Sequence, residues 1–84
     1  MIYGNKEYKL LLETDIFKYF IHDDELIMIS KEDGSINDDD YTAKSWFEDS
    51  LENIANGSEK EIYMDAYEKQ ARKELGELYE ESKL

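Results

Sequence analysis

An 84-residue chain with 22 Asp and Glu against 10 Lys and Arg carries a net charge of −12, which opposes binding to nucleic acid or to anionic lipid. A core of this size leaves little apolar surface for a deep catalytic cleft. The chain also lacks Cys for disulfides or thiolate metal sites, and its apolar runs are too short to span a bilayer. We therefore expect a cytoplasmic protein that is not an enzyme, uses no cofactor and does not enter membranes.

The composition nevertheless indicates a folded chain. Hydrophobic residues make up 40% of the sequence and aromatic residues 13%, which is more than an acidic disordered tail contains. The acidic residues are spread over both halves of the chain. We therefore predict a single acidic α+β domain over residues 1–84.

Three strands are predicted in the first half, over residues 7–13, 16–22 and 25–31. Apolar residues alternate with more mixed neighbours at Tyr8, Leu10 and Leu12, at Phe17, Tyr19 and Ile21, and at Ile27 and Ile29. Short polar breaks separate the segments, as in an antiparallel meander with one covered face. The middle segment has a short helix as its alternative, and residues 1–5 either add an edge strand or fray.

A first helix is predicted over residues 41–56. Ala43, Phe47, Leu51 and Ile54 form an apolar stripe at helical spacing, and the acidic residues before them favour a helix N-terminus. Asn56 and Gly57 supply a left-handed C-terminal cap.

A second helix is predicted over residues 58–81. Ser58 and Glu61 form a capping box, and an apolar stripe follows at Tyr63, Tyr67, Ala71, Leu75 and Leu78. We expect Phe47, Leu51, Leu75 and Leu78 to be buried where the helices meet the sheet. The predicted fold class is therefore α+β, with a short antiparallel β-meander of about three strands followed by two helices packed on one face.

Metal and catalytic motifs are weak. Residues 33–40 are similar to the second half of an EF-hand calcium loop, but Ile29 and Lys31 occupy the positions of two ligands in the first half. His22 is the only His, and beside Asp23 it is typical of a surface turn. We expect no metal site and no catalytic residue, and we keep a calcium-responsive regulatory module as an alternative function.

Clustered carboxylates are the main functional signal. Carboxylates one helical turn apart are separated by about 5.4 Å, a spacing comparable with that of successive phosphates in a nucleic-acid strand. Tyr adds contact area with a polar tip. The alternative is a solvated acidic face without a partner. The predicted partner-binding residues are Asp23, Asp24, Glu25, Asp38, Asp39, Asp40, Tyr41, Glu48, Asp49 and Glu52.

In size, charge, lack of Cys and clustered acids, the chain resembles the small acidic inhibitors of phages and mobile elements, the DNA-mimic anti-restriction and anti-CRISPR proteins. The resemblance implies an inhibitor that occupies the basic nucleic-acid-binding surface of a nuclease or another DNA- or RNA-processing enzyme and does not bind nucleic acid itself. A phage-encoded protein of this kind would act in the bacterial cytoplasm. The closest alternative is an immunity or antitoxin protein that neutralises a basic toxin.

Overall fold

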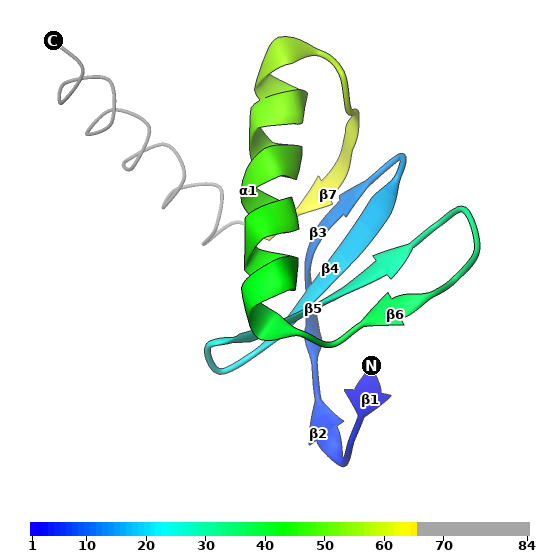
Figure 1. The fold of residues 1–84 in the computed structure, drawn as a ribbon, viewed down its shortest axis with the longest axis vertical. Coiled ribbons are helices and arrows are strands. Elements are labelled where there is room, and N and C mark those ends of the chain that lie inside the picture. The colour runs from blue at the N-terminus through cyan, green and yellow to red at the C-terminus, as the bar shows by residue number, and fades with distance from the viewer. Residues whose placement is uncertain (66–84) are drawn as a thin grey trace, which may run out of the picture.

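The computed structural model describes residues 1–65, which form a small hairpin and a larger sheet with one helix (Figure 1). The elements are β1 (Ile2–Tyr3), β2 (Lys6–Glu7), β3 (Lys9–Thr14), β4 (Phe17–His22), β5 (Glu25–Ser30), β6 (Ile36–Asn37), α1 (Asp40–Asn56) and β7 (Glu61–Met64). β1 and β2 pair with each other, and Gly4 and Asn5, both at positive φ, form the turn between them. A two-residue turn with this backbone matches the twist of a tight hairpin.

The main sheet has five strands in the order β6-β5-β4-β3-β7, and every neighbouring pair is antiparallel. β3, β4 and β5 form a meander, and β6 adds a short strand at the edge of β5. The chain then forms α1 across one side of the sheet and returns as β7 along the other edge, beside β3 (Figure 1). The five-stranded sheet and α1 thus form two layers.

The strand register divides the side chains between two faces, because residues paired across antiparallel strands lie on the same side of a sheet. The inner face, which packs on α1, includes the row Met64, Leu12, Tyr19, Met28 and Asn37. The outer face, on the opposite side, includes the row Tyr63, Glu13, Lys18, Ile29 and Ile36. The two rows differ in burial, since the inner row is mainly buried and the outer row is partly or largely exposed.

Tyr19 lies at the centre of the core, in the middle strand of the sheet. Its side chain is fully buried and its ring packs edge-on against Phe47 of α1. The hydroxyl donates a hydrogen bond to the Trp46 carbonyl at 3.0 Å and pairs with the buried Ser50 hydroxyl at 2.7 Å. Burial raises the pKa of Tyr19 to about 12. Tyr19 therefore joins the sheet to the helix through both apolar and polar contacts.

The helix predicted over 41–56 is confirmed as α1. Asp39 is its N-cap, with Oδ1 accepting a hydrogen bond from the Tyr41 amide at 3.2 Å. Gly57 ends the helix at a φ of 85°, and its amide donates to the Ile54 carbonyl. Ala43 is buried as predicted. The predicted helix residues Phe47, Leu51 and Ile54 are partly buried and pack against the core.

The prediction of a second helix is wrong over its first turn, because residues 61–64 form β7. The Ser58 amide donates to the Asn53 carbonyl and so extends the cap of α1. The Lys60 amide donates to Asp15 Oδ1, and the Asp15 amide donates to the Lys60 carbonyl. Pairing with β3 supplies backbone partners along an otherwise open sheet edge, which outweighs a single capping interaction. The rest of the predicted helix, including Leu75 and Leu78, lies outside the described residues.

The predicted fold class, a three-stranded meander followed by two helices on one face, is therefore wrong. Residues 1–65 are mostly β, with a five-stranded antiparallel sheet, a two-stranded hairpin and one helix. The three central strands do occupy the predicted positions, and the middle segment is a strand.

Two face assignments also need correction. Leu10 and Leu12 were expected on one face, but a register shift between them places Leu10 opposite Phe20 on the outer face and Leu12 opposite Tyr19 on the inner face. In β5, Leu26 and Met28 face α1, whereas Ile27, which is buried as well, and Ile29 lie on the outer face, because β5 pairs with Tyr19 through Met28. Short apolar runs carry no alternation from which to choose the buried side.

Replacing Tyr19 with Phe should lower the free energy of unfolding by about 1–3 kcal/mol, because the buried Ser50 hydroxyl loses its partner while the ring is kept. Urea unfolding of the wild type and of Tyr19→Phe measures this. Tyr63→Phe, at an exposed position, is the matched control. Equal stability of the two variants would contradict a structural role for the Tyr19 hydroxyl.

Candidate functional site

The side of α1 that faces away from the sheet carries an exposed acidic stripe. α1 buries Ala43 and Ser50 against the sheet, which turns the opposite side outward. Three predicted site residues, Glu48, Asp49 and Glu52, are exposed on that side, and none of their side chains makes a hydrogen bond or an ion pair with residues 1–65. These three carboxylates, which we call the α1 acidic stripe, are available to a partner.

Tyr41 lies at the N-terminal end of the same helix. Its side chain is 84% exposed, the largest exposure among the large hydrophobic residues described. The next residue, Thr42, donates its hydroxyl hydrogen to Asp39 Oδ2 at 2.8 Å, which holds the first turn in place. An aromatic ring on a rigid first turn can enter a partner surface at little cost in conformational entropy.

The acidic sets 23–25 and 38–40, which are separate in the sequence, come together at this end of α1. The first set spans the turn between β4 and β5 and the first residue of β5, and the Leu26 amide immediately after it donates to Asp40 Oδ1 at 2.7 Å. The side chain of Asp24 makes no hydrogen bond or ion pair within residues 1–65. The turn and the helix N-terminus therefore form one acidic end of the molecule.

Several of these predicted carboxylates already have structural partners. Asp38 Oδ2 accepts from the Tyr3 hydroxyl at 2.9 Å, and this hydrogen bond raises the pKa of Tyr3. Asp39 caps α1. Glu25 Oε2 pairs with Lys6 Nζ at 3.0 Å, and the hydrogen bond from Lys6 lowers the pKa of Glu25. Reversing charges at these positions would therefore disturb the fold as well as any interface.

Asp40 has two such partners. Besides the Leu26 amide it contacts Lys44, whose Nζ lies 3.1 Å from Asp40 Oδ2. The backbone hydrogen bond, followed by Lys44, lowers the pKa of Asp40. This carboxylate thus connects the start of β5 to the first two turns of α1.

The calcium-like segment uses its oxygens for turns. Asp33 Oδ1 accepts from the Ser35 amide at 2.9 Å, and Asn37 Oδ1 accepts from the Asp39 amide at 3.0 Å. Within residues 1–65, no three metal-binding side chains are grouped closely enough to hold an ion.

His22 is half-buried rather than fully on the surface. Its Nδ1 lies 2.8 Å from the Glu7 carbonyl oxygen and its ring packs on Tyr8. These contacts tie the N-terminal hairpin to the main sheet. The sequence offered no signal for this role, because the hairpin partner lies 15 residues away.

Comparisons with family models, with curated proteins and with solved structures gave no match to this chain. No helix among the described residues combines the length and apolarity needed to cross a membrane.

Replacing Asp40 with Asn should destabilise the fold at pH 7 by an amount that shrinks as the pH falls below about 4. A carboxyl whose pKa is lower in the folded state stabilises that state when ionised. It loses this contribution as the pH falls through its folded-state pKa.

Unfolding measured from pH 3 to 7 tests this prediction, with Asp24→Asn as the control that removes the same charge from an exposed turn. Comparing Asp40→Asn with Asp24→Asn cancels the general relief of charge repulsion, because each variant removes one negative charge. Parallel stability curves for the two variants would contradict a specific role for the Asp40 carboxylate.

Proposed function

We propose that this protein is an acidic binding inhibitor that occupies the basic nucleic-acid-binding surface of a nuclease or another DNA- or RNA-processing enzyme. The observation that carries the proposal is the α1 acidic stripe with Tyr41 at its end, held on a rigid helix. In a chain that uses other acids for caps and ion pairs, these carboxylates have no partner among residues 1–65.

The dimensions of the surface suit a short stretch of phosphate backbone. Glu48 and Glu52 are about 6 Å apart along the helix axis, at 1.5 Å per residue, and Tyr41 lies about 16 Å from Glu52 along the same axis. The turn that carries Asp24 extends the acidic surface beyond the N-terminus of α1. The spacing of Glu48 and Glu52 is comparable with that of neighbouring phosphates in a nucleic-acid strand.

Tyr41 supplies a contact that does not depend on charge. Exposed aromatic rings on ordered backbone are common at the centres of protein interfaces, where they account for much of the binding energy. The flanking carboxylates would speed encounter with a basic surface and make binding sensitive to salt. Charge and ring together favour a protein partner over direct contact with nucleic acid.

The test begins by capturing basic proteins from a nuclease-treated bacterial lysate on the immobilised full-length chain at about 50 mM salt. A purified partner is then titrated with this protein and with duplex DNA at about 50 and 200 mM salt, a range over which multi-phosphate contacts weaken strongly. We expect mutual displacement, and weaker binding at the higher salt.

The matched variants are Glu48→Gln/Glu52→Gln on the stripe and Glu7→Gln/Glu32→Gln at exposed positions elsewhere. Both pairs remove two charges, but only the first should weaken partner binding, by roughly tenfold or more for two charge pairs. Simultaneous binding of DNA and this protein would rule out occupation of the groove. Neutralisation of a toxin at another surface would then explain the charge better.

A further inference from the structure

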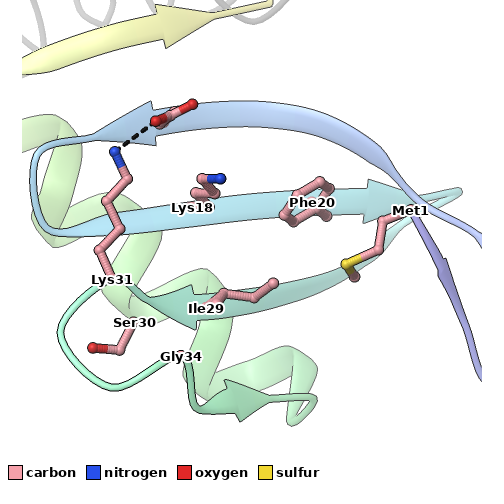
Figure 2. Close-up of a pocket in the computed structure, with 8 residues that line it drawn as sticks. Met1, Lys18, Phe20, Ile29, Ser30, Lys31 and Gly34 are labelled. Atoms are coloured by element: carbon pink, nitrogen blue, oxygen red, sulfur yellow. Dashed lines mark hydrogen bonds and ion pairs between the residues drawn. The ribbon is translucent and has the colours of Figure 1, made fainter.

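Among residues 1–65, the outer face of the sheet, on the side opposite α1, leaves several apolar side chains partly exposed. Figure 2 views this face, with Phe20 on β4 and Ile29 on β5 beside Met1 and Lys18. Together with Lys31, these four residues line a hollow of about 650 Å³. Ile36 and Tyr63 extend the same side to both sheet edges and are 46% and 44% exposed. Partly exposed apolar side chains gathered on one side of a highly charged chain are typical of a protein interface.

The charges of the outer face differ from those of the rest of the chain. Lys31 Nζ pairs with Glu13, and this hydrogen bond lowers the pKa of Glu13. The positive charge of Lys18 also lowers the pKa of Glu13. Lys18 itself makes no hydrogen bond or ion pair with residues 1–65. The centre of this face thus holds two lysines and one glutamate, although the whole chain carries −12.

We propose that the outer face is the interface of a homodimer in which two sheets pack face to face. Glu13 and Lys18 are cross-strand neighbours, so a two-fold contact can set Lys18 of each copy against Glu13 of the other. The same contact covers Phe20 and Ile29 of both copies. A second copy supplies an apolar surface and also, at Glu13, a carboxylate for the Lys18 side chain, which has no partner within residues 1–65.

This arrangement leaves both α1 helices on the outside. Because α1 packs on the inner face, two sheets joined through their outer faces present their acidic stripes in opposite directions. One dimer could then bind two partner molecules. The proposal does not depend on the function of the stripe.

Salt distinguishes the dimer from partner binding. Two copies that each carry −12 repel one another, and salt screens that repulsion while leaving apolar burial intact. Dimerisation should therefore strengthen between about 50 and 500 mM NaCl, whereas binding of a basic partner weakens with salt.

Sedimentation equilibrium of the full-length chain at about 5–500 µM tests the proposal. We expect a mass that approaches twice the 10.0 kDa of one chain, with dissociation constants that fall as salt is added. Ile29→Asp should give a single-chain mass with an unchanged circular dichroism spectrum. Glu48→Gln/Glu52→Gln, on the other side of the molecule, should still dimerise.

A charge exchange identifies the contact itself. Lys18→Glu and Glu13→Lys should each weaken self-association at least tenfold, because each places like charges across the two-fold contact. Mixing the two variants should restore a heterodimer. A single-chain mass for the wild type at every concentration, a dimer that survives Ile29→Asp, or a mixture that fails to associate would overturn the proposal.

Discussion

The contact between Tyr19 and α1 is the constraint on which the rest of the structure depends. Tyr19 occupies the central strand, and its cross-strand neighbours Leu12 and Met28 fix which face of β3 and β5 is covered. Its hydroxyl reaches the helix at Ser50, so the position of α1 over the sheet is set by a directional bond as well as by packing. The exposed side of α1 and the set of residues on the outer face both follow from this one choice of side.

The acidic residues of this chain have two different roles. Asp39 and Asp40 hold the start of α1 through backbone amides, and such hydrogen bonds favour the ionised carboxylate. The side chains of Glu48 and Glu52 make no such contact within residues 1–65, in a chain whose net charge of −12 opposes further negative charge. Exposed carboxylates without a structural partner are more readily explained by a binding role than by stability, which supports the proposed inhibitor.

Local signals in the sequence predicted α1, its glycine cap and the positions of the three central strands, because these depend on neighbouring residues. They failed where distant residues decide the outcome. The capping pattern at Ser58 and Glu61 gave way to pairing with β3, and the bulge before Leu12 reversed the expected face of Leu10. For the candidate site, the sequence shows where acidic residues gather along the chain. It could not separate carboxylates that cap or pair from those left exposed, since their partners lie elsewhere in the chain.

The late return of the chain as β7 has a kinetic consequence. The paired backbone and side-chain hydrogen bonds between Asp15 and Lys60 join residues 45 positions apart, with β4, β5 and α1 inside the loop that they close. Closing a loop of that length costs entropy before any contact compensates for it, whereas the meander and α1 form from near neighbours. We infer that β7 adds to the sheet after the folding transition state. Substitutions in β7 would then mainly accelerate unfolding, and this edge of the sheet would be the first to open.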